Sequence, residues 1–211
     1  MLDLLRSTST PFVGGAYERG AILFRQDDPA SSVMYIEHGR VYLSVTGADG
    51  REAICGLLGA GAFLGEEAIT GQAVRLHTAA ALSRTDVLII ASNHAVHLFG
   101  TSHVASDRLI AQIIASRERL EADLYDHLTH PVEQRLARAL LTLADCTHHE
   151  PCGCVVPRIS QTLLAEMVGT SRTRVNTILR KFARLGIIET QEGAFHITSA
   201  LGQFVRKAPG K

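Results

Sequence analysis

The pattern of hydrophobic and polar positions changes its period twice along the chain. Between residues 12 and 91, short apolar runs alternate with turns rich in glycine and aspartate. Several short strands at such close spacing are typical of an antiparallel barrel, roll or sandwich. The first part of the chain is therefore predicted to be a small β domain, with strands over Ala21–Arg25, Ser32–Glu37, Arg40–Thr46, Glu52–Leu58 and Val87–Ala91.

The stretch from Ser102 to His127 has a helical period and contains neither glycine nor proline. Two series of positions seven residues apart form a seam typical of a coiled coil, and its members are Ile110, Ile113, Arg117, Leu120, Leu124 and His127. Leu109 and Ile114 are expected to pack on the helix's own domain. The pattern favours a parallel dimer helix over an amphipathic helix buried within one chain. His130 and Pro131 then mark a hinge, because proline suits the first turn of a following helix.

After the hinge, helices and short strands follow one another in the order of a winged helix. Ser160 can cap one helix, Gly169 can end it in the left-handed conformation, and Thr170 or Ser171 can cap the next helix. A further helix is expected before this pair and a β-hairpin after it. The remaining predicted elements are a helix over Val132–Ala144 and strands over Val155–Ile159, Ile187–Thr190 and Ala194–Thr198, the last two joined by a turn at residues 191–193.

The second helix of the pair has one apolar and one polar face. Its inward positions are predicted to be Val175, Ile178, Leu179, Phe182 and Leu185. Its outward positions are Arg172, Arg174, Asn176, Thr177 and Lys181. Arginine can bind guanine edges, asparagine adenine edges, and threonine thymine methyl groups or phosphate, so this face suits a DNA major groove. A plain helical hairpin with a solvated basic face is the alternative.

The distribution of charge supports a nucleic-acid partner for the second part of the chain alone. The formal net charge is zero, with 21 basic and 21 acidic residues. Residues 1–128 contain 10 Lys and Arg against 15 Asp and Glu, whereas residues 129–211 contain 11 against 6. An acidic first part and a basic second part indicate two domains, of which only the second meets phosphate.

The sequence also bears on location and on catalysis. No apolar run reaches the length of about 18 residues that a membrane span needs, and the N-terminus lacks the pattern of a signal peptide. We therefore expect a cytoplasmic protein with no membrane partner. Motifs of serine hydrolases, phosphate-binding loops and zinc proteases are absent, so no enzymatic activity is expected.

A second polar feature lies within the β domain, at residues 63–75. Glu66 follows a glycine, and Arg75 comes after a short turn or helix, which places one carboxylate and one guanidinium near each other. A buried charge needs a partner or a ligand, and an arginine beside backbone N–H groups forms an anion site. The alternative is a surface turn that carries an incidental Glu–Arg pair.

Cysteines and histidines are concentrated in one loop of the second domain, at Cys146, His148, His149, Cys152 and Cys154. These side chains have the chemistry to bind zinc or to form a disulfide on oxidation. The Cys-x-Cys spacing is not a standard zinc pattern, however. We expect a polar surface loop and assign no metal.

Four motifs follow one another along the chain: Gly39-Arg40-Val41, Gly50-Arg51-Glu52, Gly61-x-Phe63-Leu64-Gly65-Glu66 and Leu164-Ala165-x-x-Val168-Gly169-x-Ser171-Arg172. Found in this order, they resemble the Crp/Fnr (cyclic-AMP receptor protein/fumarate-nitrate regulator) family of bacterial transcription factors. The resemblance implies an α+β fold with an N-terminal β-roll, a jelly roll like those that bind cyclic nucleotides, over residues 1–100. A dimerisation helix and hinge would occupy residues 101–129, and a winged helix-turn-helix residues 130–211.

The resemblance also implies partners. A homodimer would read a palindromic operator in double-stranded DNA, with half-sites about one helical turn apart, and RNA polymerase is a candidate partner. Ser171 and Arg172 match family positions that hold phosphate and guanine, whereas Thr173 and Thr177 replace a glutamate and an arginine. A different operator sequence is therefore expected. Ser160 and Gln161, at the start of the first helix, complete the set of candidate DNA contacts.

For the β-roll, the resemblance implies a nucleotide cassette whose candidate residues are Gly65, Glu66, Glu67, Ala68, Arg75 and Leu76. Glu66 would hold the ribose 2′-hydroxyl and Arg75 the cyclic phosphate, with cyclic AMP or a related nucleotide as the candidate ligand. Two features depart from the family's cyclic-AMP sensors: Leu76 replaces a serine or threonine, and Leu120 and Glu121 stand where adenine-contacting hydroxyls are expected.

Two alternatives stay open. The nucleotide pocket can be vestigial, with regulation by abundance, by another ligand, or by a thiol or metal switch at Cys146, Cys152 and Cys154. In a different class, the chain is a cyclic-nucleotide-binding module whose basic domain makes protein contacts.

Overall fold

The computed structural model describes residues 11–144, 154–156, 158–191 and 194–206. Its contacts divide the chain into two compact units, Met1–Leu120 and Glu121–Lys211, and the division falls inside the long helix α3 (His103–Thr129). Each unit is described by itself. The domain boundaries proposed from the sequence, at residues 100 and 129, remain predictions.

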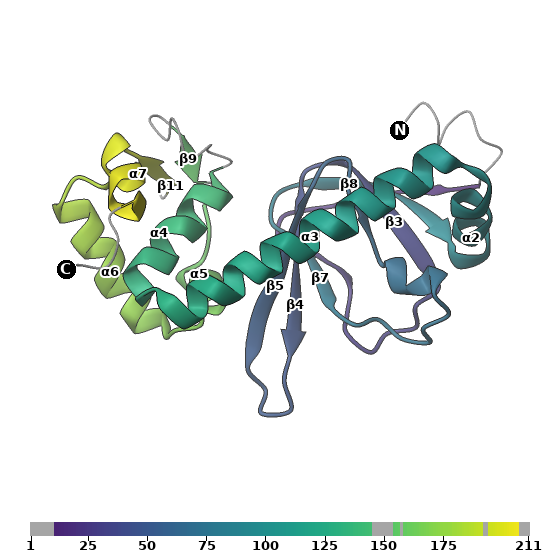
Figure 1. The fold of residues 1–211 in the computed structure, drawn as a ribbon, viewed down its shortest axis with the longest axis horizontal. Coiled ribbons are helices and arrows are strands. Elements are labelled where there is room, and N and C mark those ends of the chain that lie inside the picture. Colours follow the sequence, from purple (N-terminus) through teal and green to yellow (C-terminus); the bar gives the residue numbers. More distant parts are fainter. Residues whose placement is uncertain (1–10, 145–153, 157, 192–193, 207–211) are drawn as a thin grey trace. The chain divides into compact units, whose positions relative to one another are not determined.

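The first unit contains two antiparallel sheets (Figure 1). One has the strand order β1-β8-β3-β6 and the other β2-β7-β4-β5. The strands are β1 (Val13–Tyr17), β2 (Ile22–Phe24), β3 (Ser32–His38), β4 (Arg40–Thr46), β5 (Glu52–Gly59), β6 (Phe63–Leu64), β7 (Thr78–Ala81) and β8 (Thr85–Ala91). Two four-stranded antiparallel sheets packed on one another confirm the β-roll.

The central strand β3 is buried on both of its faces. Met34 and Ile36 point into a core shared with the second sheet, where they meet residues such as Val41 of β4. Val33 and Tyr35 point to the other side, into a core completed by α2 (Ser92–Thr101) and the start of α3. Burial on both faces explains why this strand reads as a continuous apolar run rather than an alternating one.

The helix α3 is joined to the β-roll by side-chain hydrogen bonds to strand backbone. Gln112 accepts from the backbone N–H of Phe63 and donates to its carbonyl, each over 2.7 Å. Arg119 donates to the carbonyl of Leu57 over 3.1 Å. Leu109 packs against the core beneath the helix, as expected, but Ile114 is 53% exposed, so the prediction that it packs on its own domain is wrong.

The second unit is built on helices α4 (Val132–Leu143), α5 (Gln161–Val168), α6 (Arg172–Arg184) and α7 (Ser199–Arg206), with the strands β9 (Val155–Val156), β10 (Ile188–Gln191) and β11 (Ala194–Ile197). The strands form one sheet in the order β10-β11-β9. Leu140, Leu164 and Phe182, from three different helices, are fully buried. A helical pair followed by a short antiparallel hairpin confirms the winged helix.

Several elements differ from their sequence-based predictions. The strands β1, β6 and β7 and the helices α2 and α7 were not predicted. Leu185, predicted to point inward, is 59% exposed, because α6 ends at Arg184 and Leu185 is its C-cap. The end of the predicted wing turn, residues 192–193, lies outside the described residues. Among the helices that the structure describes, none is both long and apolar enough to cross a membrane.

The Gln112 contacts give a testable prediction. Phe63 is fully buried, so Gln112→Ala should leave its N–H and carbonyl without partners and cost about 1–3 kcal/mol for each unsatisfied group. Hydrogen exchange should therefore become faster at the Phe63 amide. In Glu118→Ala, which changes an exposed residue of the same helix, exchange at Phe63 should stay unchanged. Slow exchange at Phe63 in Gln112→Ala would show that the contact does not hold β6 in place.

Candidate functional site

The candidate ligand cassette begins at the end of β6 and includes η1 (Glu66–Ile69), a single turn of 3-10 helix. Gly65 precedes this turn with a φ of 80°, in the left-handed region. A β-carbon at this position would overlap Arg75 Nη1 and would lie 3.1 Å from the carbonyl oxygen of Ser32. Glycine is required here both by the backbone angle and by the guanidinium that passes against it.

Arg75 is buried, with 2% of its surface exposed. Its Nη1 donates to Glu67 Oε1 over 3.2 Å and to the carbonyl of Gly65 over 3.3 Å, and its Nη2 donates to Ser32 Oγ over 3.0 Å. The guanidinium carbon lies 4.2 Å from the centre of the Phe24 ring. Arg75 Nε is buried and has no hydrogen-bond partner among the described residues. The cassette therefore centres on an enclosed cation whose Nε–H group has no partner among the described residues.

The ion-pair partner of Arg75 is Glu67 rather than Glu66. Both side chains of the pair are buried, with exposures of 2% for Arg75 and 7% for Glu67. The sequence placed a carboxylate near the guanidinium but nominated Glu66, the first residue of the turn. Adjacent residues of a 3-10 helix point about 120° apart, so only one of the two carboxylates meets the guanidinium directly. The role predicted for Glu66, to hold the ribose 2′-hydroxyl, stays a prediction.

Glu66 is left partly buried, and no ion pair joins it to any described residue. Burial raises the pKa of the Glu66 carboxyl above its ordinary value, with a smaller contribution in the same direction from the neighbouring Glu67. A hydrogen bond to its own backbone N–H, His77 and Arg75 oppose the rise. Glu66 is thus a desolvated carboxylate that a hydroxyl donor can stabilise. Ala68 is buried beneath the turn, and Leu76 is 50% exposed.

The predicted seam of α3 carries exposed apolar side chains. Ile110, Ile113, Leu120 and Leu124 expose between 47% and 60% of their surface, and Arg117 is also exposed. His127 is exposed too, and its Nδ1 lies 2.9 Å from the carbonyl oxygen of Asp123. An apolar stripe that its own chain leaves uncovered marks an interaction surface.

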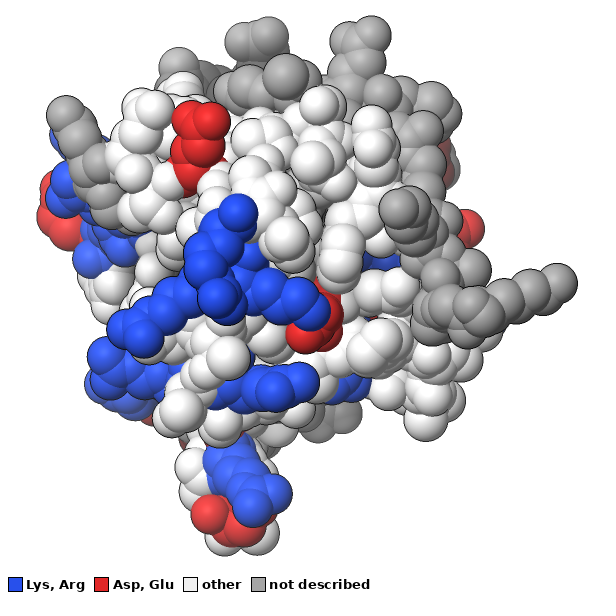
Figure 2. Space-filling model, turned by 90° about the vertical axis from the view of Figure 1, so that its left-hand side faces the viewer, with Lys and Arg blue, Asp and Glu red and all other residues white. Residues whose placement is uncertain are grey.

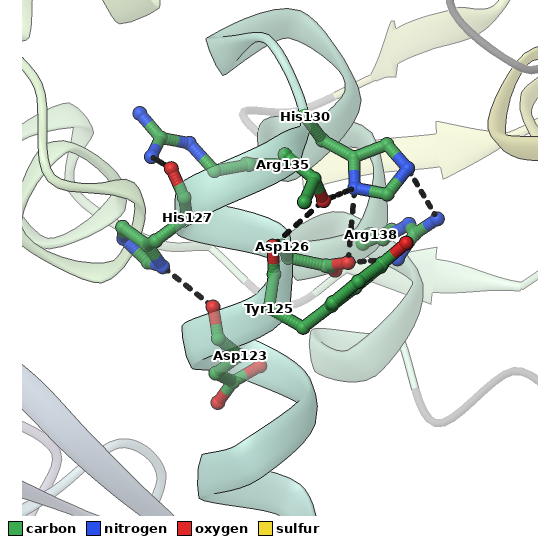
Figure 3. Close-up of polar contacts among 8 residues, drawn as sticks. Asp123, Tyr125, Asp126, His127, His130, Arg135 and Arg138 are labelled. Atoms are coloured by element: carbon green, nitrogen blue, oxygen red, sulfur yellow. Dashed lines mark hydrogen bonds and ion pairs between the residues drawn. The ribbon is translucent and has the colours of Figure 1, made fainter.

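The end of α3 and the start of α4 are tied together by a polar network (Figure 3). Arg138 forms an ion pair with Asp126, and its Nη2 lies 3.5 Å from His130 Nε2. The Thr129 hydroxyl donates to the carbonyl of Tyr125 over 2.7 Å, so it accepts from His130 Nδ1 at 2.9 Å. His130 Nδ1 also lies 3.3 Å from Asp126 Oδ1. The network thus joins the last turn of α3 to α4 across His130 and Pro131.

Serine caps hold both helices of the α5–α6 pair. Ser160 Oγ accepts from the N–H of Leu163 over 3.0 Å, and Ser171 Oγ accepts from the N–H of Arg174 over 3.2 Å. Between the two helices, Gly169 has a φ of 62°. These three positions match the sequence-based prediction, with Ser171 rather than Thr170 as the second cap. In each cap the serine oxygen accepts a hydrogen bond from a backbone N–H group, so the hydroxyl hydrogen can still donate to a phosphate.

The outer face of α6 carries several predicted DNA contacts. Arg172, Thr173, Arg174 and Thr177 are exposed, and Asn176 is partly exposed. Figure 2 shows a face on which Lys and Arg side chains gather, with few acidic side chains among them. Lys181 differs from the others, because its Nζ donates to Glu133 Oε2 of α4 over 2.8 Å. It is thus engaged within the unit.

Two arginines of α6 were missed. Arg180 and Arg184 are exposed and, together with Thr177 and Ala183, line a shallow pocket of about 520 Å³. Arg180 also lines a second hollow of about 350 Å³ with Gln161, Asn176 and Thr190, so this hollow extends from the start of α5 across α6 to β10. The sequence could have shown that these two arginines share a face with the predicted contacts, since residues 173, 177, 180 and 184 repeat at helical spacing.

The cysteine and histidine loop falls almost wholly outside the described residues. Only Cys154 of that group is described, and it is partly buried and disulfide-bonded. Within the described part of the chain, no cluster of side chains is arranged to hold a metal ion. Metal binding or a thiol switch in this loop stays an untested prediction.

The geometry at Gly65 predicts a large effect of one added methyl group. Gly65→Ala should destabilise the protein by more than the strain of a left-handed residue, which is about 1–3 kcal/mol, because the new β-carbon displaces Arg75. Gly50→Ala is the matched control, since Gly50 has a φ of 75° and nothing within 4 Å of the same position. Chemical denaturation of both variants measures the difference. Equal losses of unfolding free energy in the two variants would contradict the close approach of Arg75 to Gly65.

The raised pKa of Glu66 predicts a pH-dependent stability. A carboxyl whose pKa is higher in the folded than in the unfolded state favours folding when protonated, and that advantage is lost as the pH rises through the folded value. Glu66→Gln should therefore raise the thermal midpoint at pH 7, and the gain should disappear on acidification. Thermal unfolding between pH 4 and pH 8 checks both parts. A gain that did not change with pH would have another cause.

Comparison with known proteins supports this description of the two units. Residues 15–102 match the model of the cyclic nucleotide-binding domain, and residues 134–200 match the Crp-like helix-turn-helix domain. The "Cyclic AMP receptor protein" of Thermus thermophilus is 28% identical over 87% of this chain and 83% of its own length. The "CRP-like cAMP-activated global transcriptional regulator" of Mycobacterium tuberculosis is 25% identical over 91% and 86%.

A solved structure agrees with the fold. The crystal structure of a transcriptional regulator of the CRP family from Thermus thermophilus superposes with a TM-score of 0.78 at 24% sequence identity. The match covers 93% of this chain and 98% of that one. At this level of identity the likeness concerns the arrangement of helices and strands, not the chemistry of the sites.

Proposed function

Because the chain belongs to the Crp/Fnr family of transcription regulators, we propose that it acts as a homodimer that binds a palindromic operator and responds to an anionic nucleotide in its β-roll. The observation that carries the DNA-binding part is the outer face of α6. That face presents Arg172, Arg174, Asn176 and Arg180, while its inner face is buried in the winged helix. The residue types are those that read base edges and phosphates in a major groove.

The proposed dimer rests on the apolar stripe of α3. Ile110, Ile113, Leu120 and Leu124 are about half exposed and recur at the spacing of a coiled-coil seam. Pairing of this stripe with a second copy would remove it from water and place two recognition helices in one assembly. A two-fold dimer requires a two-fold operator, which is why the binding site should be palindromic.

The proposed ligand is cyclic AMP or a related nucleotide. Arg75 supplies the cation for a phosphate, and Glu66 supplies a desolvated carboxylate for the ribose hydroxyl. The Mycobacterium tuberculosis relative is named as activated by cyclic AMP, which supports this class of ligand. Ligand binding would shift the population between two arrangements of the dimer helices, with movement about the hinge at His130 and Pro131.

The remaining parts of the proposal follow from the family. A regulator of this kind works in the cytoplasm, where the operator DNA lies, with RNA polymerase as its candidate protein partner. Its chemistry is binding rather than catalysis. The alternative of a vestigial pocket is favoured by one observation, the carboxylate of Glu67 already bound to Arg75. The choice between a vestigial and a working pocket therefore depends on whether a ligand can displace Glu67.

The DNA-binding proposal predicts different results for two arginines of α6. Arg172→Ala should weaken operator binding by about 1–3 kcal/mol and relax the preference at one base pair, because a bidentate base contact is lost. Arg180→Ala should weaken binding to all sequences if its contact is to phosphate, and should lower the salt slope by about 1. Operator selection followed by affinity measurement at several salt concentrations checks both.

Arg51→Ala is the control for these variants. It removes one positive charge from an exposed position of the first unit, where Arg51 pairs with Asp49. This variant should keep the operator affinity, the base preference and the salt slope of the wild type. Lys181→Ala should have a smaller effect than Arg172→Ala, because Lys181 is already engaged by Glu133. Unchanged affinity and base preference in Arg172→Ala would contradict the assignment of α6 as the reader. Affinity that did not fall with salt would contradict DNA binding by the basic unit.

A further inference from the structure

Glu67 holds the cation that the anionic group of a ligand would need. Its Oε1 lies 3.2 Å from Arg75 Nη1, and both side chains are buried. We propose that Glu67 is a built-in counter-ion that competes with the ligand's phosphate for Arg75 and so sets the affinity and selectivity of the sensor. The inference rests on the proposed function in one respect, that Arg75 is the anion contact of the β-roll.

The enclosure of Arg75 makes the competition direct. The guanidinium is surrounded by the Gly65 carbonyl, Ser32 Oγ, the Phe24 ring and Glu67, and only 2% of its surface is exposed. Of these four neighbours, only Glu67 carries a charge. A phosphate that reaches Arg75 must therefore either displace the Glu67 carboxylate or share one cation with it. Two anions beside one guanidinium repel each other, so sharing is unfavourable.

The resident pair is also incomplete. Arg75 Nε is buried with no hydrogen-bond partner among the described residues, and a buried donor without a partner carries a desolvation cost. Glu67 meets the guanidinium through one oxygen at Nη1 alone. A phosphate has oxygens enough to accept from Nε and a neighbouring N–H together, which is the favoured geometry for arginine. The Nε–H group therefore offers a phosphate ester a contact that the Glu67 carboxylate does not make.

Selectivity follows from this balance. A free phosphate gains the Arg75 contacts but must displace Glu67, so it should bind weakly. A nucleotide gains further contacts outside the guanidinium, including a hydroxyl bound by the desolvated Glu66 carboxylate. Displacement of Glu67 thus makes the sensor respond to a phosphate that carries a hydroxyl-bearing group rather than to phosphate alone.

The test compares the full-length wild-type protein with Glu67→Gln and Glu67→Leu. Glutamine keeps an oxygen for Arg75 without the charge, and leucine removes both. Calorimetric titration with cyclic AMP and cyclic GMP should show an affinity about tenfold or more higher for Glu67→Gln than for wild type. The reason is that glutamine removes the negative charge that repels the phosphate of the nucleotide. Glu52→Gln, which neutralises an exposed carboxylate of the same unit, should bind like wild type.

A second measurement covers the case in which loss of Glu67 harms folding. Glu67→Leu leaves a buried arginine without its counter-ion, which is destabilising. Inorganic phosphate should then restore its thermal midpoint by a larger shift than it gives wild type or Glu52→Gln. A purely structural ion pair would give Glu67→Leu no such selective rescue, and that result would overturn the inference.

The outcomes separate this inference from the proposed function. If wild type and Glu67→Gln bind cyclic nucleotide with equal affinity, the nucleotide site is real but Glu67 does not compete for it, and the inference is wrong. If neither binds a nucleotide but phosphate selectively rescues Glu67→Leu, the counter-ion role stands and the nucleotide assignment fails. If phosphate rescues nothing and no variant binds, both are wrong.

Discussion

The burial of the Arg75 guanidinium constrains the rest of the ligand cassette. A cation withdrawn from water must be hydrogen-bonded and paired with an opposite charge, or its burial is strongly unfavourable. Gly65 leaves room for it, Phe24 offers a ring face, and Glu67 supplies the opposite charge. These residues come from β2, the end of β6 and η1, so one buried charge determines the chemistry required at separate places in the sequence.

The same region of the β-roll is connected to the long helix. Phe63 lies two residues before Gly65, and its backbone N–H and carbonyl are both bound by Gln112 of α3. The Phe63 ring also packs against Tyr35 of β3 and Phe99 of α2. A displacement of Glu67 that shifts Gly65 would therefore strain contacts that hold α3 to the sheet. Within this unit, the cassette and the long helix α3 form one connected structure.

The sequence predicted the elements whose side chains carry a strong pattern, and it failed where the pattern is weak. The strands β3, β4, β5 and β8 are rich in β-branched and long apolar residues, whereas β7 is Thr-Ala-Ala-Ala and β6 has two residues. Spacing alone could not show which carboxylate meets Arg75. Glu66 and Glu67 are adjacent, and the choice depends on the rotation of a single 3-10 turn. Both helix caps were predictable, because serine before an apolar run has a local cause.

In α6, the exposure of a basic side chain does not by itself show whether that side chain can bind DNA, because an ion-pair partner can already hold it. Lys181 and Arg180 are neighbours in the sequence, and composition treats them alike. Lys181 reaches Glu133 of α4 and helps join two helices of its own unit, whereas Arg180 lines the hollow that α6 shares with Gln161 and Thr190. A charge already paired must lose that partner before it binds phosphate, whereas an exposed arginine beside other polar groups need only lose water. Arg180 is for this reason the stronger candidate for a DNA contact, although the sequence pattern had nominated Lys181.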